Sequence, residues 1–179
     1  MYPAAGFKYR VGGESFFQVN RFLIDGLVHT AIGDAGGAWA VDLYAGVGLF
    51  SLPLAKRFAR VTAVESGASS VRDLRFNADR AEVTMEASRN ATDEFLRGLK
   101  AAPDFVLADP PRTGLGRAVV ARLAAIKPRR ITIVACDPAT LARDLPGLLA
   151  AGYRMERLTM VDLFPQTFHV ETVVDLRLD

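Results

Sequence analysis

The stretch V-D-L-Y-A-G-V-G-L-F, residues 41–50, decides the fold. Its first residues are typical of the end of a buried strand, and Gly46 and Gly48 follow directly. Glycines between a strand and a helix let the backbone turn tightly and approach a ligand at the carboxyl edge of a sheet. The same glycines would also suit a tight turn without a ligand, so this motif alone leaves both interpretations open.

Outward from this motif, apolar runs alternate with amphipathic stretches along the chain. We expect buried strands over residues 39–44, 60–65, 104–109 and 131–136. We expect crossover helices over residues 50–58, 69–80, 117–126 and 139–149, the last broken or bent at Pro146. This alternation predicts an α/β fold with βαβ units around a mostly parallel sheet.

Two further segments complete the predicted fold. Apolar residues at helical spacing predict a helix over 16–32, within a lead-in hairpin and helix that occupy residues 1–37. The β-rich stretches 153–163 and 168–178 are close enough in the sequence to form an antiparallel pair that ends the sheet. We therefore expect one domain, with its α/β core over residues 38–179.

Composition narrows the function classes. With 179 residues, 50% of them hydrophobic, the chain can build one packed core, and its net charge of +2 permits an anionic partner without arguing for one. A single cysteine excludes an internal disulfide and a four-cysteine zinc or iron–sulfur site. We expect no metal, no signal segment and no membrane span, and hence a cytoplasmic protein.

The glycine motif and the next strand together indicate a nucleoside cofactor. Glu65 ends that strand at the spacing where a carboxylate accepts hydrogen bonds from a ribose diol, although a solvated charge is the alternative. A nicotinamide dinucleotide fits less well, because Ser51 stands where its fingerprint has a third glycine. S-adenosylmethionine, a nucleoside cofactor without a pyrophosphate, fits better. Asp42 would lie near the positively charged end of this cofactor, and the alternative is that Asp42 only caps the turn or the helix.

D-P-P-R, residues 109–112, follows the third predicted strand. Two prolines stiffen the chain and keep Asp109 out of helical geometry. A loop with a purely structural role would use the same residues, so that alternative stays open beside a functional acid. Many methyltransferases that act on exocyclic amines have an aromatic residue after such prolines. Arg112 takes that place here, which argues against amine methylation and leaves a guanidinium for phosphate or a base edge.

Cys136 ends the fourth predicted strand, and Pro138 begins the next helix. A lone cysteine is most often a small buried hydrophobe. A thiol at a strand end beside a helix N-terminus, however, is where thiol pKa values fall, so a catalytic role is an equal alternative. Alternation over the last strand places His169 and Glu171 on one face, opposite Phe168, although each alone is more often structural.

Together these segments resemble the RNA 5-methyluridine methyltransferases over almost the whole chain. The shared motifs, in the family's order, are S-F-F-Q-V-N, L-Y-A-G-V-G-L-F, A-V-E, D-P-P-R-T-G-L, A-C-D-P-A-T-L-A-R-D-L and F-P-Q-T-F-H-V-E. The resemblance implies a Rossmann-like class I methyltransferase fold with a seven-stranded sheet and an antiparallel end strand. It also implies methylation of uridine C5 in tRNA or rRNA.

The resemblance also assigns residues. Cys136 is expected to be a nucleophile that adds to uridine C6, and Glu171 the base that removes the C5 proton. Arg112 and His169 are expected on the RNA side of the site. For S-adenosylmethionine binding the resemblance implies Gln18, Tyr44, Glu65 and Asp109, with Asn90 at a less distinctive position. The glycine motif itself adds Asp42, Gly46 and Gly48 to the expected cofactor residues.

Two departures from the family pattern motivate alternatives. Asp137 and Gln166 stand where the family usually has asparagine and histidine, and a carboxylate beside Cys136 should disfavour its thiolate. Family members also commonly carry an N-terminal RNA-binding domain, which is expected to be separate or missing here. The alternatives are a non-catalytic cofactor- or RNA-binding module and a methyltransferase for another target.

Overall fold

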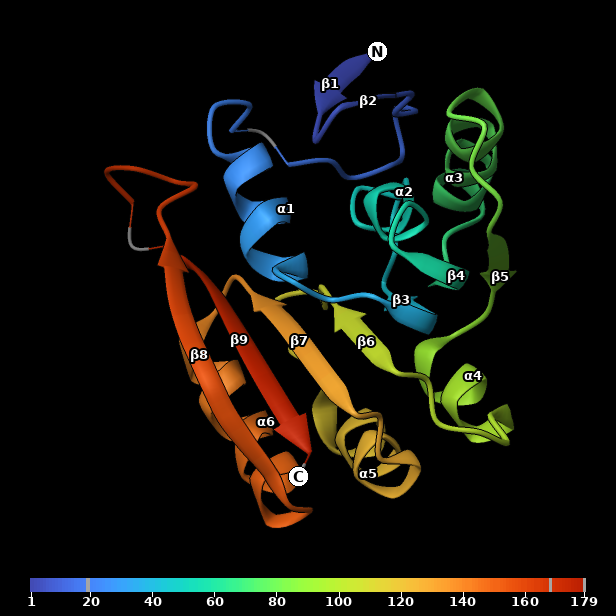
Figure 1. Cartoon of the computed structure of the whole chain (residues 1–179). Coiled ribbons are helices and arrows are strands. Elements are labelled where there is room, and N and C mark those ends of the chain that lie inside the picture. The colour runs from blue at the N-terminus through green and yellow to red at the C-terminus, as the bar shows by residue number, and fades with distance from the viewer. Residues whose placement is uncertain (19, 168, 179) are drawn as a thin grey trace.

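The computed structural model describes residues 1–18, 20–167 and 169–178. Its centre is a seven-stranded sheet in the order β5-β4-β3-β6-β7-β9-β8 (Figure 1). The strands are β3 (Gly37–Leu43), β4 (Phe58–Glu65), β5 (Glu86–Arg89), β6 (Phe105–Ala108), β7 (Arg130–Ala135), β8 (Tyr153–Val161) and β9 (Glu171–Leu178). A small antiparallel hairpin, β1 (Tyr2–Ala4) and β2 (Phe7–Tyr9), lies outside this sheet.

Five neighbouring strands, β5, β4, β3, β6 and β7, run parallel, whereas β9 runs antiparallel to both β7 and β8. The α/β class, the mostly parallel sheet and the antiparallel pair at its end are therefore confirmed. The four strands predicted from apolar runs are also present, each within two residues of its expected bounds.

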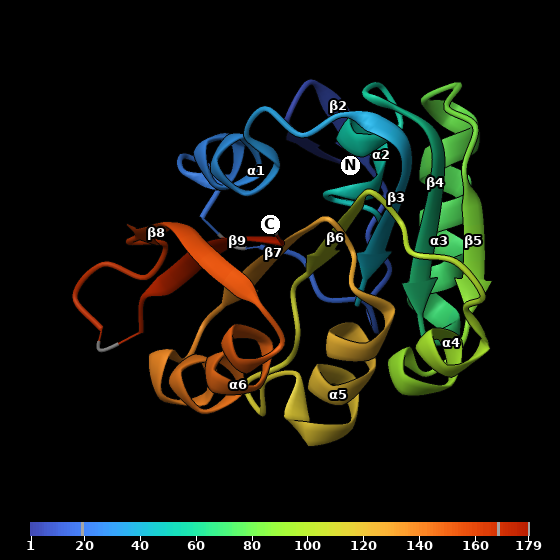
Figure 2. The same ribbon diagram turned by 60° about the horizontal axis from the view of Figure 1, so that its bottom comes forward.

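Helices cover both faces of the sheet. They are α1 (Ile24–Ile32), α2 (Ser51–Leu54), α3 (Ala68–Arg80), α4 (Thr92–Gly98), α5 (Gly116–Ile126) and α6 (Pro138–Ala150). Figure 2 shows α4, α5 and α6 on one face and α1 and α2 on the other. Successive residues of a strand enter different apolar clusters, one on each face of the sheet. In β3, Ala40 belongs to one cluster and Val41 to the other. Burial on both faces explains why the parallel strands are continuous apolar runs in the sequence.

Three predicted helices differ from those observed. The helix expected over 16–32 spans only Ile24–Ile32, because the Asn20 carboxamide accepts the backbone N–H groups of Phe22 and Leu23 and forms a turn. The helix expected over 50–58 ends at Leu54, since Phe58 begins β4 and stacks on Phe105. Of the break or bend expected at Pro146, the break is wrong, because α6 continues through this residue with Leu145 and Leu148 buried on either side.

The sequence patterns missed β5 and α4. The expected strand over 168–178 begins at Glu171 in the structure, and Phe168 lies outside the described residues. Within the described ranges, no helix is both long enough and apolar enough to span a bilayer.

A buried ion pair joins the antiparallel strand to the parallel ones. Arg130 at the start of β7 donates to both carboxylate oxygens of Asp175 in β9, at 2.7 and 2.5 Å. Its third bond, at 2.6 Å, goes to Asp34 after α1. The Asp175 side chain is 7% exposed and that of Asp34 is 77% exposed. One guanidinium therefore holds a buried and a solvated carboxylate.

We predict that Asp175→Asn lowers the free energy of unfolding by about 3 kcal/mol, because it removes the buried carboxylate and leaves the guanidinium only the exposed Asp34 as a charged partner. The matched control Asp34→Asn should cost less than about 1 kcal/mol, since water screens that exposed pair. Urea denaturation of both variants measures the difference. Equal losses would contradict the assignment of the stabilising role to the buried pair.

Candidate functional site: a pocket at the carboxyl edge of the sheet

A pocket of about 630 Å³ opens where the parallel strands end. Four of its residues stand at or just after the last residue of a parallel strand: Tyr44, Glu65, Asp109 and Cys136. Glu171 enters from the opposite direction, since it is the first residue of antiparallel β9. The remaining predicted residues that line the pocket are Gln18, Gly46, Arg112 and His169.

Glu65 ties together the two loops that form one wall of the pocket. Its Oε2 accepts the Gly46 N–H at 2.9 Å, and its Oε1 accepts the Gly67 N–H at 2.6 Å. Gly46 has a φ of +54° and open space where a Cβ would stand, and Tyr44 adopts the left-handed region at φ +61°. The glycine loop thus requires a backbone conformation that favours glycine and turns toward the pocket.

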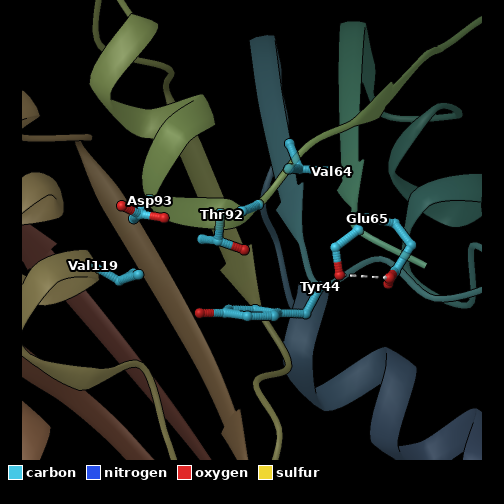
Figure 3. A pocket seen from close by; sticks show the side chains of 8 residues that line it. Tyr44, Val64, Glu65, Thr92, Asp93 and Val119 are labelled. Atoms are coloured by element: carbon cyan, nitrogen blue, oxygen red, sulfur yellow. Dashed lines mark hydrogen bonds between the residues drawn. The ribbon is translucent and has the colours of Figure 1, made fainter. Parts of the chain in front are cut away.

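A smaller pocket of about 220 Å³ adjoins this wall. Figure 3 shows the Tyr44 ring crossing it from the β3 end toward Thr92 and Val119, with Glu65 on the other side of the tyrosine backbone. Asp93 completes its far side. An aromatic ring, an apolar wall and two carboxylates together suit a flat heterocycle that carries a sugar.

Three predicted cofactor residues do not line the main pocket. Gly48 has φ +98°, and an added Cβ would come within 2.7 Å of Leu74, so this glycine serves packing. Asp42 lies wholly buried behind the loop and accepts a short hydrogen bond from the Ser51 hydroxyl. Asn90 is exposed and donates to the Ser88 hydroxyl.

Cys136 and Glu171 occupy facing ends of neighbouring strands. The β7 and β9 register pairs Ala135 with Thr172, so Cys136 and Glu171 are the next facing positions. Facing residues of an antiparallel pair project to the same side of the sheet. Glu171 is buried, and its Oε2 has no hydrogen-bond partner within the described ranges.

The electrostatics of the thiol differ from the expectation of a lowered pKa. Burial raises the pKa of Cys136, and the carboxyl groups of Glu171 and Asp109 raise it further. A backbone hydrogen bond and the positive charge of Arg112 lower it. The net direction of the Cys136 pKa is upward, opposite to the lowering that its place beside a helix N-terminus led us to expect.

The sequence suggested that Asp137 would oppose the thiolate. Instead, its carboxylate accepts the N–H groups of Ala139 and Thr140 at 2.8 and 3.3 Å and caps α6. The acidic neighbours that raise the thiol pKa are Glu171 and Asp109. Asp137 therefore serves as a helix cap, a role that asparagine also fills well.

The other buried acids also favour their protonated forms. Burial raises the pKa of Asp109 well above its usual range, and Glu171 and Asp42 add to the effect. Burial likewise raises the pKa of Glu171. For Asp42, burial raises the pKa to about 7, the Ser51 hydrogen bond opposes this rise, and Glu65 adds to it. Positive charge from a ligand would stabilise the ionised forms of these groups.

Several aromatic and polar lining residues were missed by sequence reasoning. Phe16 and Phe17 directly precede Gln18, so an aromatic pair beside a predicted site residue was a usable signal. Phe164 also lines the pocket, and the centroid of its ring lies 6.2 Å from that of the His169 ring. Ser66, Ser70 and Thr92 had no distinctive spacing.

The sheet order is that of the Rossmann-like methyltransferase fold, and the pocket lies at the carboxyl edge where such sheets bind ligands. Precorrin-6y C5,15-methyltransferase from Geobacter metallireducens is 13% identical with a TM-score of 0.75, covering 96% of this chain and 94% of that one. At that identity the likeness shows the fold alone.

Sequence comparison gives the family. The profile of the tRNA (uracil-5-)-methyltransferase family matches residues 4–178, and the chain belongs to this family. It is 36% identical over 173 residues to a protein named an uncharacterized RNA methyltransferase from Thermotoga maritima, covering 94% of this chain and 39% of that protein. A Streptomyces coelicolor protein of the same description is 41% identical over 183 residues, covering 94% of this chain and 38% of its own length.

A solved relative agrees in fold and sequence. Pyrococcus abyssi tRNA (uracil-54, C5)-methyltransferase, in complex with S-adenosyl-L-homocysteine, is 35% identical with a TM-score of 0.85. The match covers 94% of this chain and 41% of that one. The chain thus spans about two fifths of the length of these relatives.

We predict that Asp42 makes stability depend on pH. The pKa of Asp42 in the folded protein, about 7, lies above that of an unfolded aspartate, so the folded state holds this proton more tightly. The resulting contribution to the free energy of unfolding is fully present below about pH 4 and is lost as pH rises through about 7. Asp42→Asn should remove a slope of up to about 1.4 kcal/mol per pH unit in this window. Urea denaturation at several pH values tests this, with exposed Asp79→Asn as the control. A wild-type slope in the Asp42 variant would refute the assignment.

Proposed function

We propose that this chain transfers a methyl group from S-adenosylmethionine to C5 of a uridine in RNA. The observation that carries the proposal is the placement of Cys136 opposite Glu171 in the pocket that the glycine loop borders. Family membership and the Pyrococcus relative, a tRNA (uracil-54, C5)-methyltransferase, support the same reaction.

The pocket fits the proposed cofactor by its chemistry. The Gln18 side-chain oxygen is buried, borders the pocket and accepts no hydrogen bond within the described ranges, so it is available to an ammonium or hydroxyl group. Glu65 supplies a carboxylate for sugar hydroxyls, and Tyr44 with Val119 supplies apolar surface for a base. The Pyrococcus relative contains S-adenosyl-L-homocysteine, the demethylated form of this cofactor.

Cys136 is proposed to activate the uracil ring. Uracil C5 is a weak nucleophile, but a bond from the thiolate sulfur to C6 moves the ring electrons toward C5 and makes it enolate-like. When bound, S-adenosylmethionine supplies an electrophilic methyl group on a positively charged sulfur. The electron pair at C5 forms the new carbon–carbon bond, and S-adenosylhomocysteine leaves.

Glu171 is proposed to complete the reaction. C5 then carries both the new methyl group and its original proton, and a carboxylate must remove that proton. The released electron pair restores the C5–C6 double bond and expels the Cys136 sulfur. Burial raises the pKa of Glu171, which makes its ionised form a stronger base than an exposed glutamate.

Arg112 and His169 are proposed to contact the RNA. Both line the pocket, and Arg112 is exposed in the segment that follows β6. A guanidinium there is able to bind a phosphate or the edge of the uracil base. The positive charge also favours the thiolate of Cys136, so one side chain supports both substrate and nucleophile.

We predict that RNA containing 5-fluorouridine, with S-adenosylmethionine present, forms a covalent complex with the chain. Fluorine at C5 is not removable as a proton, so elimination of the sulfur is blocked. Denaturing gel electrophoresis and mass spectrometry detect the adduct. Cys136→Ala should abolish it, whereas Glu171→Gln should accumulate an adduct even with ordinary uridine.

The RNA must first be shown to bind, for instance by a mobility shift. Bound 5-fluorouridine RNA that yields no adduct would contradict the covalent reaction. Cofactor binding by calorimetry without adduct or methylated product would instead support the alternative of a binding module without turnover. The raised pKa of the Cys136 thiol is the observation that favours this alternative.

A further inference from the structure

The segment that carries Arg112 is attached to helix α6 by an arginine–aspartate pair. The Arg143 guanidinium donates to the Thr113 carbonyl at 2.7 Å. Asp144 Oδ2 accepts the Leu115 N–H at 2.7 Å and the Gly116 N–H at 3.3 Å, at the start of α5. Arg143 also donates to both oxygens of Asp144, at 2.8 to 3.0 Å. The two adjacent side chains thus hold the backbone of Thr113, Leu115 and Gly116.

The turn itself fixes where Arg112 stands. The Gly114 N–H donates to the Pro111 carbonyl at 2.8 Å, so Arg112 and Thr113 form the corner of a four-residue turn. Gly114 has φ +74°, and an added Cβ would lie 2.5 Å from Asp144 Oδ2. The turn is therefore packed directly against the pair, with no room for a larger residue.

Helix α6 is also the helix that begins beside the proposed nucleophile. Cys136 and Asp137 immediately precede its first residue, Pro138. A rigid helix about two turns long therefore lies between the thiol and the Arg143–Asp144 pair. Arg112 and Cys136 follow the neighbouring strands β6 and β7, and the turn fastened to α6 is a second link between the two residues.

We propose that Arg143 and Asp144 are positioning residues that hold the turn of residues 111–114 against α6, so that the Arg112 guanidinium stays at the pocket that Cys136 also lines. The inference rests on the proposed role of Cys136 as nucleophile. Arg143 is half exposed at 51%, whereas the Asp144 side chain is 5% exposed, so the carboxylate forms the fixed point of the arrangement.

Several groups besides Arg112 act on the thiol and must be kept constant in a test. Burial, Glu171 and Asp109 raise the pKa of Cys136, and Arg112 is the side chain that lowers it. The charged or titratable groups around the thiol come from five places in the fold. They are Glu171 in β9, Asp109 after β6, Arg112 in the turn, Asp137 at the α6 cap and His169 before β9.

Cys136 is the single cysteine of the chain, so alkylation reports on this thiol alone. Iodoacetamide forms an S–C bond as iodide leaves, at a rate that follows the thiolate fraction. We expect Arg143→Ala to slow alkylation about three-fold at neutral pH and to move the rate profile to higher pH. Arg143→Lys should recover part of the rate, and Arg117→Ala, an exposed arginine in the first turn of α5, should match wild type.

A double-mutant cycle separates positioning from general loosening. Arg112→Ala should slow alkylation by a similar factor, and adding Arg143→Ala should produce no further change. A further slowing in the Arg112→Ala background, or a wild-type profile for Arg143→Ala, would overturn the proposal. If Arg143→Ala fails to fold, Gly114→Ala displaces the turn with every charge retained and should shift the profile in the same direction.

The measurement needs neither RNA nor cofactor, so it is independent of methyl transfer. The expected alkylation pattern, together with no adduct on bound 5-fluorouridine RNA, would contradict the proposed reaction and support the positioning role. An adduct together with an unchanged alkylation profile in Arg143→Ala would support the reaction and overturn the positioning role.

Discussion

Burial of the parallel strands on both faces is the constraint on which the rest of the structure depends. Helices cover the two sides of the sheet, so a polar side chain on a central strand finds water or a ligand only at the strand's end. Tyr44, Glu65, Asp109 and Cys136 stand at those ends. The architecture thus gathers residues from distant parts of the sequence without any one loop having to reach across the molecule.

The same burial gives the site its electrostatic character. Asp42, Asp109 and Glu171 lie close enough to raise one another's pKa or that of the thiol, and burial is the first cause for each. A site with excess buried acid stabilises a cationic ligand, and S-adenosylmethionine carries a sulfonium and an ammonium group. Arg112 is the side chain whose positive charge opposes these acids at the thiol.

Sequence reasoning was most successful where pattern and chemistry coincide. Continuous apolar runs predicted β3, β4, β6 and β7, and the ends of these runs predicted Tyr44, Glu65, Asp109 and Cys136 in the pocket. It was less successful where structure depends on contacts between distant residues. Strand β5 is short and partly exposed, so no apolar run marks it. Asp42 and Gly48 were expected in the cofactor site, but packing against Ser51 and Leu74 decides their roles. The raised pKa of Cys136 comes from carboxylates 27 positions before it and 35 after it in the printed sequence, which local spacing cannot reveal.

The register between β7 and β9 sets the spacing of Cys136 and Glu171 by main-chain hydrogen bonds. Those bonds depend little on the identity of the flanking side chains and not at all on the length of the connection from β8 to β9. Insertions or deletions between Val161 and Glu171 would therefore change what the mouth of the pocket presents to a substrate while the two reactive groups keep their separation.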